Sequence, residues 1–356
     1  MKKGLLLIPY LKGYGGTETV VNNLLNQFDK NMNDLDVSLS TYSFGGSESP
    51  WWLKHNKVRI IYYPQNKLIR TIMYMISLPL VIPYLLFINK PDFVISTNPV
   101  IWFIAKKASL LLKLDINVIA WYHYSYELKP VKPIFLKSAD KYFTISKTAK
   151  AELIEKDVDP KKIFVVYNPV LPSDKVIKHS DQHNILVYVG RTEYEGQKNI
   201  SELFKALSKI KEHDWILLNY GVGPDKKELV DLSIRLGIED NIKWMGFKEN
   251  VFDYIEEADS LVLTSSYEGF SMVIAEAVSH GLFAVSSDCP SGPSELINRE
   301  NGRLYNPGDI NKLSQLLENV IHGKYDNNHE AIKASINHLY INHYFDNFIA
   351  QIRNND

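Results

Sequence analysis

Two glutamates, Glu268 and Glu276, flank seven residues in a segment that joins a short apolar run to a helical one. Residues 260–266 have the length and composition of a buried strand, and residues 272–280 have helical periodicity that stops at Gly281. A strand, a turn that contains glycine and a helix direct backbone N–H groups and the positive end of the helix dipole toward an anion. One carboxylate stands in the turn and the other about two turns into the helix. The pair would therefore suit a ligand with phosphate in its middle and hydroxyl groups on both sides, such as a nucleotide-sugar.

The acid–base pair of a hydrolase is the other interpretation of these two carboxylates. Their spacing of eight residues, with one of them on a helix, argues against it, because the two groups would then serve different ends of one ligand. The spacing favours a ligand-binding element over paired catalysis.

Two cations occupy a second junction between a strand and a helix. Arg191 follows the apolar run 185–190, and Lys198 stands seven residues further along the chain. Arg can hold two phosphate oxygens at once and Lys adds a compact charge, so the junction suits a pyrophosphate. A solvated loop with two surface charges is the alternative.

A glycine-rich segment, residues 13–19, joins the first expected strand to the first expected helix. Glycines at such a turn let the backbone approach a phosphate or a sugar closely. The spacing is neither that of a dinucleotide fingerprint nor that of a P-loop. The segment alone is equally consistent with a turn that is rich in glycine for steric reasons.

Short apolar runs alternate with helical stretches along the whole chain, as in parallel, doubly wound α/β sheets. The 356 residues suggest two such domains. A proline-rich, polar stretch at 171–184 is the expected linker between a first domain, residues 1–170, and a second domain, residues 185–337. The expected strands are residues 4–9, 37–42, 93–96, 118–121, 141–145 and 163–166 in the first domain, and 185–190, 215–220, 242–245, 260–264 and 283–287 in the second.

Cysteine usage and the start of the chain indicate a cytoplasmic protein. Cys289 is the only cysteine, so an internal disulfide is excluded and a reducing compartment is favoured. The apolar run near the start is short and lacks a cleavage site of small residues, so a first strand is a better interpretation than a signal peptide.

The net charge of −1 hides an asymmetry between the two halves of the chain. Residues 1–184 carry a balance of +9, and the remainder carries −10. No nucleic-acid-binding module accompanies the basic half, so we expect no nucleic-acid partner. Peripheral contact with an anionic membrane, on the inner face of the cell membrane, suits it better, because the same half carries long apolar segments.

Two of these apolar segments are residues 68–88 and 101–113. The first approaches the length of a membrane span, but Pro79 and Pro83 interrupt it and an expected strand follows it at once. A helix packed in the core or resting in the membrane interface is therefore favoured. The second segment is basic and amphipathic, and an ordinary surface helix explains it equally well.

A metal ion is not expected. The acidic pairs Asp34/Asp36 and Asp157/Asp159 have the spacing of metal-dependent transferases, but neither follows the end of an expected strand. The histidines are scattered rather than spaced as ligands.

The second half of the chain resembles the retaining glycosyltransferases of the GT-B fold that carry an E-x7-E element (glycosyltransferase family 4-like). Glu268 to Glu276 carry the strongest part of the resemblance. Further matching pieces are Gly190-Arg191, Lys198-Asn199, Gly221-Val222-Gly223-Pro224, Gly246-Phe247 and Gly292-Pro293-Ser294-Glu295. The first half matches only in patches, at residues 15–18 and 121–123. Ser271 departs from the family, which often has glycine there.

The resemblance implies two Rossmann-like domains that face a central cleft and a role for each matching residue. Arg191 and Lys198 would neutralise the diphosphate leaving group, and the backbone at Phe270 and Ser271 would bind diphosphate or sugar hydroxyls. Glu276 would accept hydrogen bonds from the ribose, and Glu268 would face the transferred sugar. In the acceptor-binding first domain, Gly16 would lie under the diphosphate and His123 near the reacting sugar, although a core histidine remains the alternative. A C-terminal helix at about residues 338–356 would cross back onto the first domain.

The expected function is transfer of a hexose (galactose, glucose or an N-acetylhexosamine) from a UDP-sugar to a bacterial glycan or lipid-linked acceptor. Retention of anomeric configuration is implied by the resemblance, and residues 288–295 resemble the branch that builds surface polysaccharides and glycolipids. A nucleotide-sugar epimerase of the same fold would show no hexose transfer to any acceptor. A non-catalytic nucleotide-sugar or membrane-glycan binding protein would release no UDP.

Overall fold

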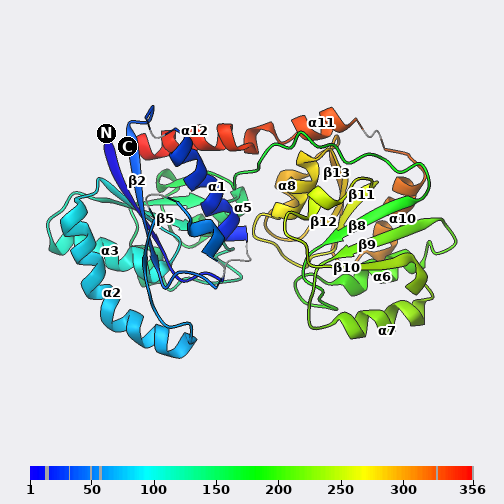
Figure 1. Ribbon diagram of the computed structural model, residues 1–356, viewed down its shortest axis with the longest axis horizontal. Coiled ribbons are helices and arrows are strands. Elements are labelled where there is room, and N and C mark those ends of the chain that lie inside the picture. The colour runs from blue at the N-terminus through cyan, green and yellow to red at the C-terminus, as the bar shows by residue number, and fades with distance from the viewer. Residues whose placement is uncertain (13–15, 32, 49, 56–57, 326–327, 355–356) are drawn as a thin grey trace. The chain divides into compact units, whose positions relative to one another are not determined.

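The structure, a computed structural model, describes residues 1–12, 16–31, 33–48, 50–55, 58–325 and 328–354. The chain divides into two compact units (Figure 1). Unit 1 comprises Met1–Pro169 and Tyr344–Asp356, and unit 2 comprises Val170–His343. The predicted end of the first domain at residue 170 lies next to the observed end at Pro169. The predicted linker at 171–184 is not a separate segment. Residues of that segment belong to unit 2, where Ile177 is fully buried and donates its N–H to the carbonyl of His280.

Unit 1 contains a seven-stranded parallel sheet in the order β3-β2-β1-β4-β5-β6-β7. All of its central strands are buried, as expected for a parallel sheet that helices cover on both faces. Its strands are β1 (Lys2–Ile8), β2 (Val37–Phe44), β3 (Val58–Ile61), β4 (Phe93–Ser96), β5 (Asn117–Tyr122), β6 (Lys141–Thr144) and β7 (Ile163–Val165).

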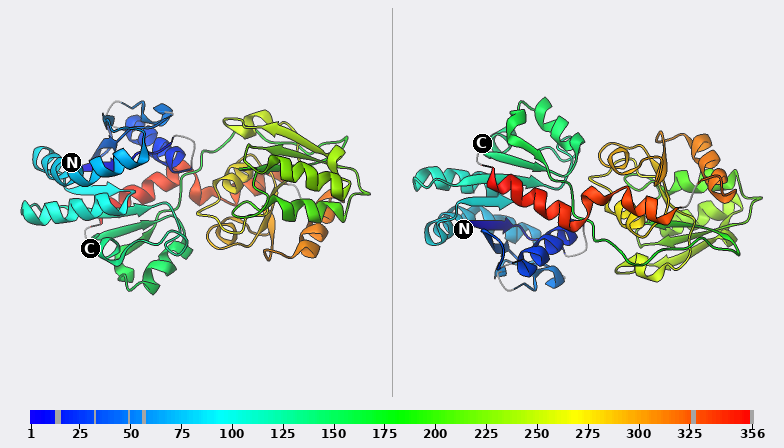
Figure 2. Two further views of the ribbon diagram at one scale, coloured as in Figure 1. Left: turned by 90° about the horizontal axis from the view of Figure 1, so that it is seen from below. Right: turned by 90° about the horizontal axis from the view of Figure 1, so that it is seen from above.

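Alternation along the strands divides the core of unit 1 between the two faces of the sheet. On β5, Tyr122 belongs to the cluster that α2 and α3 cover, whereas its neighbour Trp121 packs on Phe348 of α12 at 5.4 Å between ring centroids. Figure 2 shows α12 lying across unit 1, and Phe345 of this helix meets Phe28 of α1. The helices of unit 1 are α1 (Gly16–Lys30), α2 (Lys67–Asn89), α3 (Pro99–Leu111), α4 (Pro133–Leu136), α5 (Lys147–Glu155) and α12 (Ile341–Arg353).

Unit 2 contains a six-stranded parallel sheet in the order β10-β9-β8-β11-β12-β13. Its strands are β8 (Asn184–Val189), β9 (Trp215–Tyr220), β10 (Ile242–Gly246), β11 (Ser260–Leu263), β12 (Ala284–Ser287) and β13 (Gly302–Tyr305). Its helices are α6 (Ile200–Ser208), α7 (Lys226–Leu236), α8 (Met272–Ser279), α9 (Pro293–Leu296), α10 (Ile310–Ile321) and α11 (His329–Ala334).

The prediction of two Rossmann-like domains with parallel sheets is confirmed. Both sheets have the doubly wound order in which the first and fourth strands are neighbours. The structure adds β3 and β13, which the sequence analysis did not identify, at edges of the two sheets. Short edge strands carry little apolar signal: β3 has no fully buried residue, and β13 contains a glycine and an arginine.

Candidate active site

The expected donor-binding residues gather where the strand order of unit 2 reverses. β8 and β11 are neighbours in the sheet, and the chain leaves them in opposite directions toward β9 and β12. In doubly wound sheets this switch point, at the carboxyl ends of the strands, is where ligands bind. Lys198 stands in the loop after β8, and Glu268 stands in the loop after β11.

Lys198 and Glu268 form a shielded ion pair at this switch point. Lys198 Nζ lies 2.7 Å from Glu268 Oε1, and the two side chains are only 13% and 8% exposed. The same carboxylate oxygen accepts a hydrogen bond of 2.6 Å from the hydroxyl of Ser265. The two contacts fix the position of this carboxylate at the edge of the sheet.

Ser265 was not identified by the sequence analysis. It is the second residue beyond β11, it is fully buried, and its carbonyl also accepts a hydrogen bond of 2.6 Å from Ser287 at the end of β12. The available signal was its position, because a buried serine directly after a strand has to find polar partners at the edge of the sheet.

Arg191 lies on the same loop as Lys198 but is exposed. Its guanidinium contacts Glu193 at 2.9 Å and donates to the side-chain carbonyl of Gln197 at 2.6 Å. The backbone carbonyl of Gln197 accepts the N–H of Ser266, so the Arg191 loop is tied to the loop after β11. The Arg191 side chain is 62% exposed, which leaves it open to a ligand or to solvent.

The turn before α8 has a backbone conformation that is unfavourable for the serine at its start. Ser271 has φ 62°, a left-handed conformation that glycine adopts most easily. It is 4% exposed, and its hydroxyl has no hydrogen-bond partner among the described residues. Gly292, at φ 119°, packs against the backbone of Phe270, where an added Cβ would come within 2.9 Å of the carbonyl. A strained turn and an unsatisfied buried hydroxyl at a helix start are features of a ligand site.

Glu276 lies in α8, and burial raises the pKa of its carboxyl to about 7. No described residue donates a hydrogen bond to this side chain, although it is only partly accessible. A half-buried carboxylate without donors is a site that ligand hydroxyls could satisfy.

Neighbouring loops at this edge carry further buried polar atoms without partners among the described residues. They are Thr192 Oγ1, both side-chain polar atoms of Asn219, and Ser291 Oγ. The backbones there are tightly packed: a Cβ at Gly221 would lie 1.8 Å from the carbonyl oxygen of Gly190, and one at Gly223 would lie 2.1 Å from that of Thr192. Such groups require water or a ligand, so they extend the candidate site over the loops after β8, β9 and β12.

In unit 1, the expected residues lie at the carboxyl edge of its own sheet. His123 follows β5 and packs against Trp121 with ring centroids 4.4 Å apart and the ring planes tilted by 58°. Burial lowers the pKa of His123 to about 3, so the imidazole is neutral at physiological pH. Neither ring nitrogen makes a hydrogen bond of good geometry with a described residue. The Asn168 side chain interacts with this ring and opposes the fall in its pKa, so the imidazole has a polar neighbour within unit 1.

Gly16 is the first residue of α1 and is exposed. Residues 13–15, the rest of the predicted glycine-rich motif, lie outside the described residues. Burial raises the pKa of Tyr124, Glu18 adds to the rise, and a hydrogen bond with Thr17 opposes it. These interactions place the start of α1 beside the loop that carries His123.

The predicted acidic pairs lie away from these carboxyl edges. Asp36 directly precedes β2 and forms an ion pair with Arg353, whose hydrogen bond lowers the pKa of the Asp36 carboxyl. Asp159 caps the turn that leads into β7. Both positions are at the amino ends of strands, where structural roles explain them.

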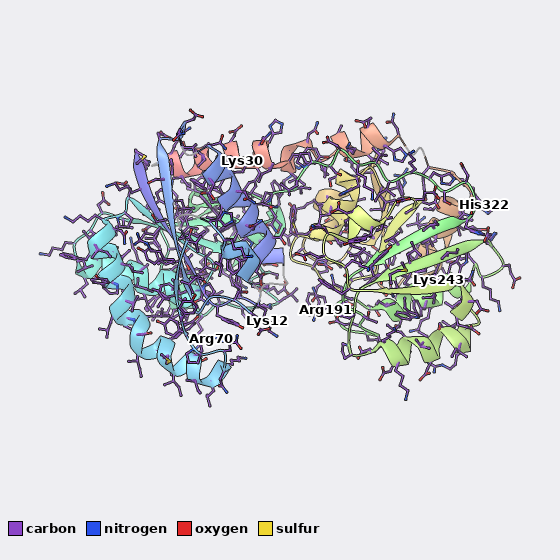
Figure 3. The ribbon with its side chains drawn as sticks, in the orientation of Figure 1. Lys12, Lys30, Arg70, Arg191, Lys243 and His322 are labelled. Carbon is purple, nitrogen blue, oxygen red and sulfur yellow. The ribbon has the colours of Figure 1, made fainter. Side chains whose placement is uncertain are left out.

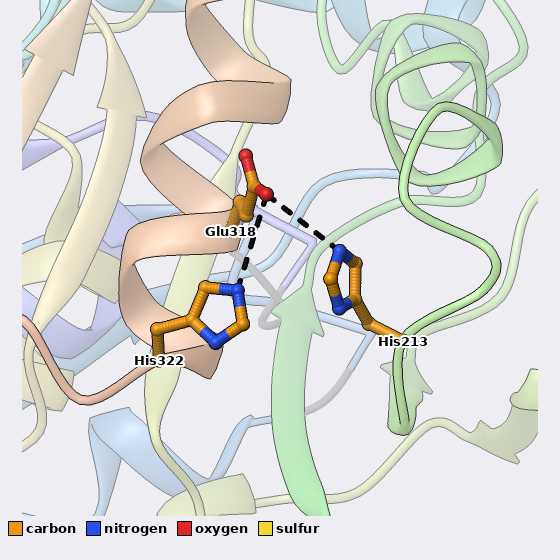
Figure 4. Close-up of side chains that lie close together, drawn as sticks. All are labelled: His213, Glu318 and His322. Atoms are coloured by element: carbon orange, nitrogen blue, oxygen red, sulfur yellow. Dashed lines mark ion pairs between the residues drawn. The ribbon is translucent and has the colours of Figure 1, made fainter.

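Three side chains in unit 2 are less scattered than the sequence suggested (Figure 4). His213 Nε2 and His322 Nε2 lie 3.6 and 3.9 Å from Glu318 Oε1, and their candidate ligand atoms fall within 4.8 Å of one another. His213 precedes β9, so the cluster is at the amino edge of the sheet, and Figure 3 places His322 and Arg191 at opposite ends of unit 2. It therefore takes no part in the chemistry of the donor edge.

Two doubly wound units, one with a cation–carboxylate pair and a helix start at its switch point, define the GT-B class of nucleotide-sugar enzymes. Residues 172–338 match the family described as "Glycosyl transferases group 1", and residues 14–173 match "Glycosyltransferase Family 4". The chain is 31% identical to the lipopolysaccharide 1,6-galactosyltransferase of Escherichia coli, over 94% of both proteins. It is 29% identical to the enzyme of that name from Salmonella typhimurium, over 95% of both. The chain therefore belongs to the glycosyltransferase family that these two family models describe together.

Solved structures agree with this assignment. The apo form of the lipopolysaccharide outer core galactosyltransferase WaaB superposes with a TM-score of 0.86 at 29% identity, over 98% of this chain and 99% of that one. The Anabaena protein HepE in complex with UDP superposes with a TM-score of 0.78 over 99% of both chains, and at 17% identity it supports the fold alone.

Proposed function

We propose that this glycosyltransferase moves a hexose, with galactose the first candidate, from a UDP-sugar to a lipid-linked bacterial glycan of the lipopolysaccharide type. The relatives named above motivate the sugar and the acceptor. The observation that carries the proposal is the arrangement at the switch point of unit 2. There the Lys198–Glu268 pair, the start of α8 and the unpartnered Glu276 carboxylate stand around one edge of the sheet.

The donor would be held by its two charged and hydroxylated parts. Departure of UDP builds negative charge on the β-phosphate, and fixed cations and helix N–H groups stabilise that charge. Lys198, Arg191 and the backbone at Phe270 and Ser271 are assigned to the diphosphate. Glu276 is assigned to the ribose hydroxyls because its carboxylate has no donor of its own.

Glu268 is assigned to the transferred sugar. As the bond to the phosphate breaks, the anomeric carbon gains positive, oxocarbenium-like character. A carboxylate that Ser265 and Lys198 hold in place would favour this charge. When phosphate recruits Lys198, Ser265 would still orient the carboxylate.

We also propose that the reaction retains configuration and needs no metal ion. The departing phosphate would take the acceptor proton on the face that the acceptor attacks. Unit 1 would bind the acceptor, with the neutral His123 as a hydrogen-bonding group at the carboxyl edge of its sheet. Cationic side chains at the donor edge would do the work that a divalent ion does in metal-dependent transferases.

UDP release across a panel of nucleotide-sugars, with lipid-extracted acceptors and with EDTA, tests the proposal. We expect release that requires both a UDP-hexose and an acceptor, persists in EDTA, and yields a product whose anomeric proton coupling matches the donor. Conversion of the donor to its epimer, without acceptor, would indicate an epimerase instead. Binding of UDP with no release in the whole panel would indicate a non-catalytic protein.

A further inference from the structure

One helix of unit 1 is apolar on the side that faces away from the core. The 23 residues of α2, Lys67–Asn89, have a mean hydropathy of 2.0 in their most apolar window, yet only 22% of that window is buried. The residues that pack into the core are all in the second half: Leu78, Ile82, Leu85 and Leu86. No residue of α2 before Leu78 is buried, and the contacts of this part with unit 1 come from half-buried side chains such as Tyr74.

The outward side of α2 carries large hydrophobic residues where a surface helix would carry polar ones. At 100° per residue, the positions opposite the buried side are Ile69, Met73, Ile76, Leu80, Tyr84 and Phe87, and their exposure runs from 38% to 70%. A helix that is apolar all round is normally buried in a protein or in lipid. A contiguous patch of this kind marks an interaction surface.

The neighbouring helix extends the patch. α3 packs beside α2, and the two helices lead into the adjacent strands β5 and β4, so their C-terminal ends lie at the same edge of unit 1 (Figure 1). Leu110 and Leu111 at the end of α3 are 60% and 79% exposed.

Charge identifies an anionic partner for this surface. Between Glu48 and Asp115 the chain has one acidic residue, Asp92, and nine Lys or Arg residues. Lys67 stands at the start of α2 and Lys90 just beyond its end, and both are exposed. An apolar stripe with cations at its ends complements anionic headgroups around an acyl-chain boundary.

The contacts of α2 distinguish a helix that lies on a membrane from one that spans it. Beyond its buried residues, the Tyr74 hydroxyl donates to the carbonyl of Phe44, and Asn89 donates to the Tyr42 hydroxyl at 3.4 Å. A spanning α2 would lose this packing, whereas a helix in the interface keeps it and still covers its outer side.

The start of α2 also lies near the acceptor edge of unit 1. The Arg70 guanidinium stacks 3.8 Å above the ring of Tyr10, which follows β1 at the carboxyl edge of the sheet. His123 and Gly16 belong to the same edge, and Figure 3 shows Arg70 at the end of unit 1 where Lys12 lies.

We propose that α2 is an interfacial helix that docks unit 1 on an anionic lipid surface and brings the acceptor edge to lipid-linked glycans embedded there. The identity of the acceptor rests on the proposed function, but the docking itself does not.

Vesicle co-sedimentation tests the docking with the full-length protein. We expect wild type to bind vesicles of phosphatidylethanolamine and phosphatidylglycerol and to lose this binding in high salt. Vesicles of phosphatidylcholine alone should not bind it. Ile76→Glu/Leu80→Glu should lower the partition coefficient roughly tenfold or more. Both positions are exposed and helical, so thermal unfolding should match wild type. Ile234→Glu, at a position on α7 of unit 2 that is 56% exposed, is the control and should bind like wild type.

Three results would overturn the proposal. The first is no binding of wild type to the anionic vesicles, and the second is equal binding by the double variant. The third is a wild-type dimer in sedimentation velocity that is absent in the double variant, with no binding of wild type to vesicles. The last would mean that a second copy covers α2. Transfer to a delipidated, soluble acceptor should be unchanged in the double variant, whereas transfer to the vesicle-embedded acceptor should fall. No transfer by wild type to either acceptor would contradict the proposed function and leave the vesicle result standing.

Discussion

The Lys198 ammonium and the Glu268 carboxylate lie 2.7 Å apart, so the cation assigned to the leaving group and the anion assigned to the sugar are one unit of the fold. Both side chains are shielded from water, so removal of either one would leave the charge of its partner uncompensated. Donor phosphate beside Lys198 would share this cation with Glu268. The pair therefore couples donor binding to the charge that faces the sugar.

Lys198→Ala should lower both the affinity for UDP and the free energy of unfolding. The loss of stability should be ~2 kcal/mol, because the Glu268 charge would remain largely buried without its partner. Lys198→Ala/Glu268→Gln should recover part of it in urea denaturation. Additive losses in the double variant would contradict a direct coupling between the two side chains.

Arg191→Ala should weaken UDP binding by roughly tenfold, the size expected for one charge-assisted contact, with little change in stability because the guanidinium is exposed. Lys243→Ala removes an exposed cation elsewhere in unit 2 and is the control for net charge (Figure 3). Isothermal titration calorimetry with UDP measures both variants. Equal affinity for wild type and Arg191→Ala would remove this residue from the phosphate site.

Binding of a UDP-hexose should strengthen as pH rises through about 7. The pKa of the Glu276 carboxyl is raised to about 7 by burial, so below that pH the group is protonated and accepts ribose hydroxyls poorly. The phosphates of a UDP-hexose are diesters and do not titrate in this range, which isolates the protein group. Glu276→Gln should show flat binding from pH 6 to 8, and a slope that survives the substitution would assign it to another group.

The same pKa predicts a stability effect of defined sign. A carboxyl whose folded pKa exceeds its unfolded value of 4.5 binds more protons in the folded state between those two pH values, so stability falls as pH rises from 4.5 to about 7. Above pH 7 the buried charge costs ~3 kcal/mol. Glu276→Gln should therefore be more stable than wild type at pH 8, and about equal to it at pH 4.5, in urea denaturation.

Ser271→Gly tests whether the strained turn before α8 serves the ligand. Glycine adopts φ 62° without a steric penalty, so the variant should gain ~0.5–1 kcal/mol in unfolding free energy. If the buried hydroxyl contacts the donor, the KM for the UDP-sugar should rise. Greater stability with an unchanged KM would mean that the hydroxyl has no role in binding.

The sequence was most informative where backbone geometry and chemistry coincide. The run from β11 through α8 fixes Glu268 and Glu276 by local rules of strand, turn and helix, so both elements could be predicted within a residue or two. Lys198 and Glu268 are 70 residues apart, and only the order of β8 and β11 in the sheet brings them together. That order can be expected for a doubly wound sheet, but the direct ion pair depends on side-chain packing that no local pattern encodes.

Other features depend on contacts that are invisible in a linear pattern. Ser265 became relevant only once its hydroxyl was seen to hold Glu268. The same is true of α2, where the prolines and the apolar run left open a core helix or an interfacial one. The outer side of α2 is exposed, which only the tertiary structure shows, and this exposure favours an interfacial helix.

Turnover by Glu268→Gln tests directly whether the edge between β8 and β11 is the donor site of a UDP-hexose transferase. Glutamine keeps the size of the side chain and removes its charge. We predict that kcat falls by roughly 100-fold or more while the dissociation constant of UDP does not rise, because Lys198 remains available to the phosphates. A kcat near wild type, measured as sugar transferred to the acceptor, would contradict the assignment of Glu268 to the reacting sugar.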